Sequence, residues 1–289
     1  MNSRRLIVCA DDFGFDEAIN EAVEIASRDG ILTCTSLMVG APAASDAVKR
    51  AHRLGTLRVG LHVVVVDGRP LLPSERVRHL VGAAGLFETR LLRAGLRFFF
   101  NPAVRRQLAE EIRAQFEAFR LTGLVLDHVN AHKHMHLHPT IGRMIVEIGR
   151  EYGAKAVRVP AEPRAVLQRV ASDRGESEFG HRFWSKRLRR RVHHAGFVTN
   201  DHLLGLAWSG AMTEARFLGL IDALPDGVSE IYCHPAVKQT LALARAMPGY
   251  RSVEEFAALV SPAVRRRIVE AGVELVSYGD LAPSSERCA

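Results

Sequence analysis

The sequence contains few cysteines, and none of them are paired in a short motif. Its four cysteines, Cys9, Cys34, Cys233 and Cys288, are scattered over 289 residues without a CxxC spacing. This pattern favours reduced thiols with mostly structural roles over a disulfide framework.

Long apolar stretches and a leader-like start are also missing. No uninterrupted apolar run reaches about 18 residues, and Met1-Asn-Ser-Arg-Arg leads directly into a strand-like segment. The absence of a signal-peptide core predicts a cytoplasmic protein. No repeat period and no composition break divide the chain. Barrels of this length are routinely single domains, so we expect one domain over residues 1–289.

Basic residues outnumber acidic ones, 39 to 32, which gives a net charge of +7. Such a bias suits an anionic partner, either nucleic acid or a membrane surface. The chain has no helix-turn-helix pattern and no set of aromatic stacking groups. We therefore expect no nucleic-acid partner.

Strand-like and helix-like segments alternate through the chain, which indicates parallel strands joined by crossover helices. We predict an α/β fold, a single-domain TIM-like barrel that is distorted and has seven or eight strands, with an open sheet as the alternative. Residues 161–200 form an irregular insertion that contains a basic helix at 182–195. The expected strands are 5–10, 32–39, 57–66, 123–129, 155–159, 203–208, 228–233 and 273–277, and the other expected helices are 19–27, 43–54, 102–121, 140–152, 213–224 and 253–270.

Residues 127–139, DHVNAHKHMHLHP, hold five of the 13 histidines. Alternate side chains share one face of a strand, so His132, His134 and His136 are predicted to point the same way. Imidazole is a common metal ligand. A histidine-rich tract can also be an unspecific metal-binding loop or a solvated turn, so the other strand ends must decide.

Polar residues occur at or near other predicted strand ends, where the chemistry of β/α barrels collects. Each also has a structural explanation: a turn or helix cap for the two aspartates, a core position for the histidine in the third strand, and a loop for the last histidine. Their joint placement favours a site. The residues are Asp11, Asp12, His62, Arg158 and His234.

A carboxylate and two histidines leave positions open on a divalent ion, as in catalytic zinc sites. The ion lowers the pKa of a bound water, a second carboxylate can accept its proton, and a further histidine can protonate a leaving amine or alkoxide. Because Asp11 and Asp12 are adjacent, their side chains should diverge, with one acting as base and the other as ligand. One divalent ion is expected; Zn²⁺ is favoured, and Mg²⁺, Mn²⁺ or Co²⁺ are possible.

Four motifs resemble the YdjC-like carbohydrate deacetylases: ADDFG at 10–14, GLHV at 60–63, NAHKHMH at 130–136 and CHPA at 233–236. The histidine run together with PGYRS at 248–252 looks most like the hopanoid-biosynthesis-associated branch, HpnK. The family resemblance implies a barrel-like fold and a metal-dependent hydrolase that removes acetyl from an N-acetylated amino sugar. The branch implies an N-acetylglucosaminyl group on a hopanoid, a polycyclic membrane lipid.

The resemblance also implies roles for particular residues. Asp11 matches the catalytic base, and His234 matches a general acid or a group that steadies the intermediate. The metal ligands match Asp12, His62 and His132. His134 and His136 are then expected to line the pocket, Arg158 to contact Asp11 or the substrate, and His128 and His138 to be structural.

One alternative function and one departure from the family pattern concern the same residues. A metal-dependent phosphoesterase on a similar barrel would use His134 and His136 as ligands for further metals.

Many relatives have Asp-Ser-His where this chain has Asn130-Ala131-His132. We expect Asp127 to take over the role of the missing carboxylate in orienting a metal ligand.

Two basic stretches with large apolar residues, 90–106 and 183–194, suit an anionic bilayer surface. The first contains Phe98, Phe99 and Phe100, which could equally pack into the core above a solvated basic helix face. We expect peripheral contact with the inner face of the membrane, which would fit a lipid-linked substrate.

Overall fold

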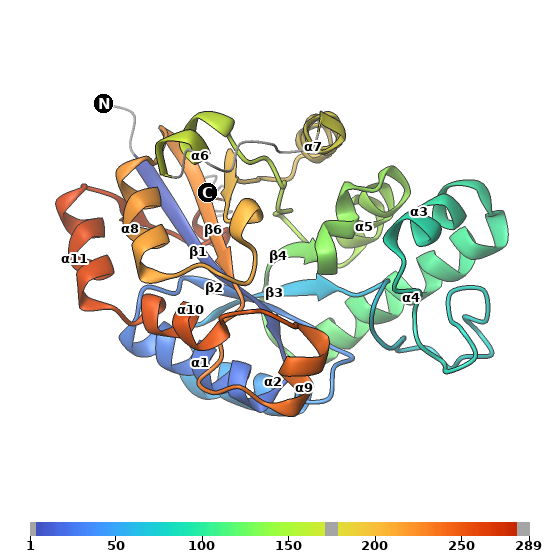
Figure 1. Ribbon diagram of the computed structural model, residues 1–289. Helices are drawn as coiled ribbons and strands as arrows, with labels where there is room; N and C mark the ends of the chain where they lie inside the picture. Colours follow the sequence, from blue (N-terminus) through green and yellow to red (C-terminus); the bar gives the residue numbers. More distant parts are fainter. Residues whose placement is uncertain (1–3, 171–178, 282–289) are drawn as a thin grey trace, which may run out of the picture.

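A computed structural model describes residues 4–170 and 179–281, and Cys288 lies outside them. Its centre is a curled sheet of seven strands in the order β4-β3-β2-β1-β6-β5, with β7 paired to β1 and every pair parallel (Figure 1). The strands are β1 (Arg4–Phe13), β2 (Cys34–Leu37), β3 (Arg58–Val63), β4 (Leu126–Ala131), β5 (His202–Leu204), β6 (Gly227–Cys233) and β7 (Glu274–Leu275).

The sheet curls like a half-barrel but does not close, so the prediction of a distorted TIM-like barrel is only partly correct. The strand expected at 155–159 makes only isolated bridges, Val129 with Val157 and Ala156 with Val198. Pro160 and Pro163 follow this segment and have no N–H to donate to a strand ladder. Beyond β4 the sheet therefore continues only through single bridges to the segment at 155–159 and from there to Val198, not through a continuous strand.

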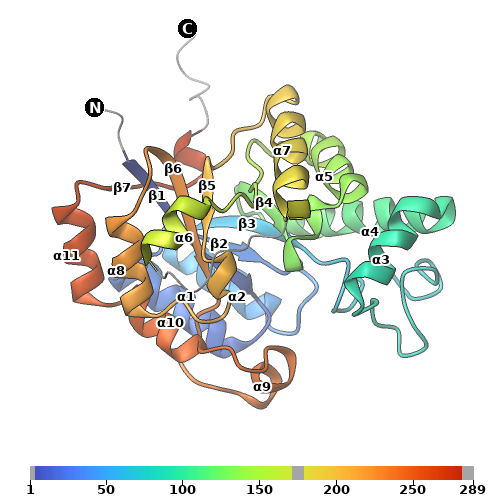
Figure 2. The same cartoon turned by 45° about the horizontal axis from the view of Figure 1, so that its top comes forward.

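Helices cover the outside of the curl (Figures 1 and 2). Helices α1, α2, α8, α10 and α11 pack in one group, and α3, α4, α5 and α7 pack in another. The helices are α1 (Glu17–Asp29), α2 (Ala44–Leu54), α3 (Leu91–Phe100), α4 (Pro102–Leu121), α5 (Pro139–Glu151), α6 (Arg164–Val170), α7 (Phe179–His194), α8 (Glu214–Asp222), α9 (Leu241–Ala246), α10 (Ser252–Leu259) and α11 (Pro262–Glu270), with 3-10 turns η1 (His132–Leu137), η2 (Leu206–Trp208) and η3 (Gly279–Leu281).

Capping residues explain two differences from the expected elements. The single helix predicted at 253–270 is two helices, because the Ser261 side chain caps a new helix that starts at Pro262. The strand expected at 203–208 ends at Leu204, because Gly205 adopts φ 106° and the chain continues as η2. Helices α3, α6 and α9 were not predicted. That residues 1–289 form one domain stays a prediction.

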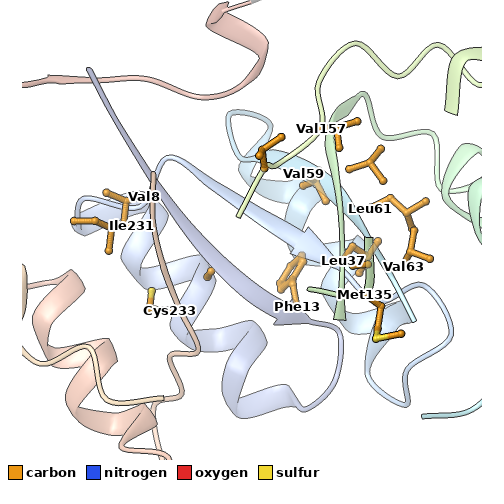
Figure 3. Packing of buried hydrophobic residues seen from close by; sticks show 14 of the residues in the cluster. Val8, Phe13, Leu37, Val59, Leu61, Val63, Met135, Val157, Ile231 and Cys233 are labelled. Atoms are coloured by element: carbon orange, nitrogen blue, oxygen red, sulfur yellow. The ribbon is translucent and has the colours of Figure 1, made fainter. Parts of the chain in front are cut away.

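Alternation along the strands separates an apolar outer layer from a polar interior. In β1, Leu6 and Val8 pack outward with the helices, whereas Ile7 and Cys9 belong to a separate inner cluster. Figure 3 shows part of the outer layer, with Val8 and Ile231 on neighbouring strands. Besides this inner apolar cluster, several strands contribute buried polar side chains, among them Ser36, His128 and Glu230.

In the part of the chain that the structure describes, no helix is long and apolar enough to cross a membrane.

Candidate active site

Three side chains from distant parts of the chain meet at the carboxyl end of the sheet. Asp12 Oδ1 lies 3.3 Å from His62 Nε2 and 3.2 Å from His132 Nδ1. One ligand atom from each residue lies within 4.8 Å of the others. Asp12 Oδ1 is buried and accepts no hydrogen bond from any described residue. An orphaned carboxylate oxygen beside two imidazoles fits a divalent cation with open coordination positions.

The end of β1 directs two adjacent carboxylates into the same cavity. The register with β2 shifts between Ala10 and Phe13, and Asp12 adopts a left-handed φ of 63°. Such irregularities re-aim side chains next to active sites. Asp11 and Asp12 thus diverge as expected, although through a left-handed residue rather than through an extended backbone.

Asp11 is held by a buried network. Arg158 Nη1 donates to Asp11 Oδ2 at 2.5 Å and Arg158 Nη2 to Oδ1 at 2.9 Å, while Ser36 Oγ donates to Oδ1 at 2.9 Å. Arg158 is completely buried and also donates to Glu230. Burial opposes ionisation of Asp11, but Arg158 and His62 hold its pKa well below the usual range. Asp11 is therefore a carboxylate at neutral pH, and Arg158 contacts it directly.

Asn130 orients His62, which corrects the expectation for Asp127. Asn130 Oδ1 lies 2.7 Å from His62 Nδ1, and its Nδ2 donates to Asp11 Oδ1 and Ser36 Oγ. This arrangement puts the proton of His62 on Nδ1 and leaves Nε2 free for a metal. Asp127 instead contacts His128 Nδ1 at 2.9 Å, away from His62. An amide oxygen can accept a hydrogen bond from the imidazole N–H as a carboxylate does, so no substitute is needed.

We expect Asn130→Ala to lower metal affinity about 10- to 100-fold, because His62 loses its orienting partner. Competition with a coloured chelator measures the affinity. Asn130→Asp is the matched control, because it keeps an oxygen for His62 Nδ1 and should retain more affinity than the alanine variant. Equal affinity in Asn130→Ala and wild type would show that this hydrogen bond has no such role.

The prediction that His132, His134 and His136 share a strand face is wrong. β4 ends at Ala131, and Lys133 and His134 adopt left-handed φ values of 51° and 53° inside η1. His134 consequently lines the cavity with its ring 5.1 Å from that of Tyr232. His136 is completely buried and is not among the residues that line the cavity. Burial lowers the pKa of His136 to about 3, so its ring is neutral.

His234 follows β6 and lines the same cavity. Its backbone N–H donates to Glu255, which also accepts from the N–H of Met212. Its ring lies between two tyrosines, 5.5 Å from Tyr232 and 5.1 Å from Tyr250. Sequence reasoning missed Glu255, Ser36, Glu230 and both tyrosines. The only sequence signal for any of them was Glu230, a charged residue inside a mostly apolar strand.

The cavity has a volume of about 680 Å³. Besides the metal-type residues, apolar side chains such as Phe15, Met38, Leu86, Leu91 and Met247 line it. A polar floor and apolar walls are typical of a small-molecule site.

Backbone strain concentrates around this cavity. Within 4–170 and 179–281, the non-glycine residues with positive φ are Asp12, Asp67, Lys133 and His134, and all four line it. Asp67 and Lys133 form an ion pair with each other at the rim. Each such residue costs of order 1–3 kcal/mol and persists where the surroundings enforce it, most often at functional sites.

Two other histidines of the run, His128 and His138, have structural contacts outside the cavity. His138 caps α5 and its Nε2 lies 3.0 Å from the carbonyl of Gly95. His128 is completely buried in the interior under Tyr278. Neither lines the cavity, as expected.

Comparisons with known proteins identify relatives over nearly the whole length. The family model described as YdjC-like protein matches residues 5–270. A carbohydrate deacetylase of Geobacillus stearothermophilus is 30% identical over 277 residues, covering 95% of this chain and 97% of the relative. A carbohydrate deacetylase of Vibrio vulnificus YJ016 is 31% identical over 281 residues, covering 96% of each chain.

A solved structure has a similar fold. A proposed cellobiose-phosphate cleavage protein of Enterococcus faecalis V583 superposes with a TM-score of 0.76 at 25% identity, covering 97% of this chain and 100% of that one. The match to the family model spans the strands that bring the Asp and His residues together, and the chain belongs to the YdjC-like protein family.

Proposed function

We propose that this protein is a metal-dependent hydrolase that removes acetyl from an N-acetylated amino sugar. The observation that carries the proposal is the meeting of Asp12, His62 and His132 beside the ionised Asp11 in one cavity. The names of its relatives, carbohydrate deacetylases, support the same reaction.

The proposed ligands of the ion are Asp12, His62 and His132. When bound, the ion supplies Lewis acidity and lowers the pKa of a water molecule. Asp11 accepts the proton of the attacking water, and Arg158 keeps that carboxylate ionised and in place. His234 gives a proton to the departing amine. The products are the free amino sugar and acetate.

We propose one ion per chain, with Zn²⁺ favoured by the Asp-His-His set and Mg²⁺, Mn²⁺ or Co²⁺ as alternatives. The phosphoesterase alternative requires more metal ligands around the cavity. His134 lines the cavity, but His136 does not, so the described residues provide no second ligand set that lines this cavity.

We propose a lipid-linked sugar as substrate, following the resemblance to the hopanoid-associated branch. Leu86 and Leu91 line the cavity, and α3 continues from Leu91 with exposed side chains. Phe98 is packed in the core, whereas Phe99 and Phe100 are exposed, Phe100 by 71%. An exposed apolar helix that begins at the rim can accommodate an apolar group attached to the sugar.

The test is release of acetate by the purified, metal-loaded protein from N-acetylglucosaminyl hopanoid and from N,N′-diacetylchitobiose. Release from the first supports the lipid-linked substrate. Release from the disaccharide alone supports the deacetylase reaction but contradicts the lipid-linked substrate. No release from either overturns the proposed reaction.

We also propose peripheral contact with the inner face of the membrane through α7. Lys186, Arg187 and Arg190 are exposed on this helix and line a groove with Phe183. In contrast, Arg189 is engaged with the carbonyls of Asn200 and Asp201. The exposed cations suit an anionic bilayer, at about 1 kcal/mol for each one near the surface.

We expect the protein to float with liposomes that contain anionic lipid at low salt, and Arg187→Glu with Arg190→Glu to abolish flotation. Arg265→Glu with Arg266→Glu on α11 changes the net charge equally at the opposite side of the molecule and should leave flotation intact. Absence of flotation by the wild type at low salt, or equal losses in both variants, would eliminate α7 as the contact surface.

A further inference from the structure

The polar interior contains a second cluster of metal-type side chains beneath the cavity. Cys9 on β1 and Cys34 on β2 are paired positions of neighbouring strands, and His128 comes from β4. All three are completely buried, and one ligand atom from each lies within 4.8 Å of the others. None of them lines the cavity that holds Asp12.

His128 reaches the cysteines because the strand between them contributes no side chain. β3 lies between β4 and β2, and a Cβ on Gly60 would stand 2.5 Å from Cε1 of the His128 ring. Tyr278 stacks on the other face of the ring with centroids 4.7 Å apart. The ring is therefore fixed between a glycine and an aromatic side chain, with Nε2 directed at Cys9.

The second ring nitrogen of His128, Nδ1, contacts a carboxylate, as is typical of metal-bound histidine. Its Nδ1 lies 2.9 Å from Asp127, whose other oxygen accepts from the N–H of Gly279 at 2.8 Å. A carboxylate on one imidazole nitrogen fixes the tautomer and makes the other nitrogen a better ligand. Asp127 thus orients His128, not His62.

The separations fit a tetrahedral site. Zinc distances of about 2.3 Å to sulfur and about 2.0 Å to nitrogen place those two ligands about 3.6 Å apart. Cys9 Sγ lies 3.7 Å from His128 Nε2. Ser36 Oγ lies 3.5 Å from Cys9 Sγ and 3.3 Å from His128 Nε2, so a hydroxyl is available at a fourth position.

We propose that Cys9, Cys34 and His128 bind a second, structural Zn²⁺ ion, with the Ser36 hydroxyl at its fourth position. Both cysteines lose their thiol protons on binding, and two thiolates with Zn²⁺ form an uncharged unit, which suits a fully buried position. Because all three side chains are completely buried, we expect the ion to bind while the chain folds. Ser36 links this site to Asp11 through its hydrogen bond, so the lower ion supports the floor of the cavity.

Cobalt distinguishes this site from the one above it, because only the lower site contains sulfur. We expect protein produced in cells grown with Co²⁺ in place of Zn²⁺ to contain two ions per chain by elemental analysis. Its absorption spectrum should contain an intense thiolate-to-cobalt charge-transfer band in the near ultraviolet. Asp12→Ala should lose one ion and keep the band.

Cys9→Ser should lose the band and keep the ion bound by Asp12. Cys233→Ser is the matched control, since Cys233 is also buried but lies outside the cluster, and it should keep the band. A folded wild-type protein without the band, and with a single ion that Asp12→Ala removes, overturns the proposal whether or not the cysteine variants fold. That outcome would not affect the proposed deacetylase reaction. Conversely, a protein that shows the band but releases no acetate would contradict the proposed reaction and still support this metal site.

Discussion

Asp11→Asn is expected to lower the rate of deacetylation about 10²- to 10⁴-fold while leaving the metal content unchanged. The amide keeps the size of the side chain and can still accept from Ser36 and Arg158, which contact the carboxylate in the wild type. It cannot accept a proton from water. The loss should therefore fall on kcat, with KM near the wild-type value.

Asp12→Asn is the informative comparison, because it changes the neighbouring residue in the same way. It should lose metal and activity together, whereas Asp11→Asn should lose activity alone. Elemental analysis of both variants, with acetate release measured in parallel, separates the two roles. If Asp11→Asn were as active as wild type, or lost its metal, the role of Asp11 as base would be untenable.

Arg158→Met is expected to lower the free energy of unfolding by about 3–5 kcal/mol. Arg158 is completely buried and is the shared partner of Asp11 and Glu230, so its removal leaves two buried carboxyl groups without their counter-charge. Methionine fills a similar volume, which keeps the loss of packing small. Urea denaturation of the wild type and the variant measures the difference.

The double variant Arg158→Met with Glu230→Gln isolates the charge effect. Burial already raises the pKa of Glu230 to about 7, against the opposing effect of Arg158. Neutralising Glu230 should therefore recover part of the stability that Arg158→Met loses. A loss below about 1 kcal/mol in the single variant, or no recovery in the double variant, would contradict the electrostatic account.

Local patterns predicted the elements whose residues pack regularly. The apolar run before Asp11 and the alternation around His62 predicted strands that form β1 and β3, because alternate burial imposes a period of two. The rule that polar residues collect at strand ends then indicated which side chains would meet. The structure places Asp12, His62 and His132 together, as that rule implies.

The remaining features depend on contacts and backbone states that no local pattern encodes. Left-handed Lys133 and His134 turn the histidine run out of the strand, although residues other than glycine adopt that conformation only uncommonly. The Arg158 contact with Asp11 joins residues 147 positions apart. The barrel stays open because a proline follows the segment at 155–159 and only isolated bridges form there. Neither the periodicity nor the residue types in that segment distinguish an open edge from a closed one.

The separation of outer and inner faces along β1 has a consequence for engineering. At Leu6 and Val8 a substitution changes volume within an apolar layer, so acceptable replacements are other aliphatic residues of similar size. Cys9 and Asp11 occupy odd-numbered positions on the other face, where a substitution changes charge and hydrogen bonding in the interior. Libraries that vary odd and even positions of this strand separately would thus tune stability and chemistry independently of each other.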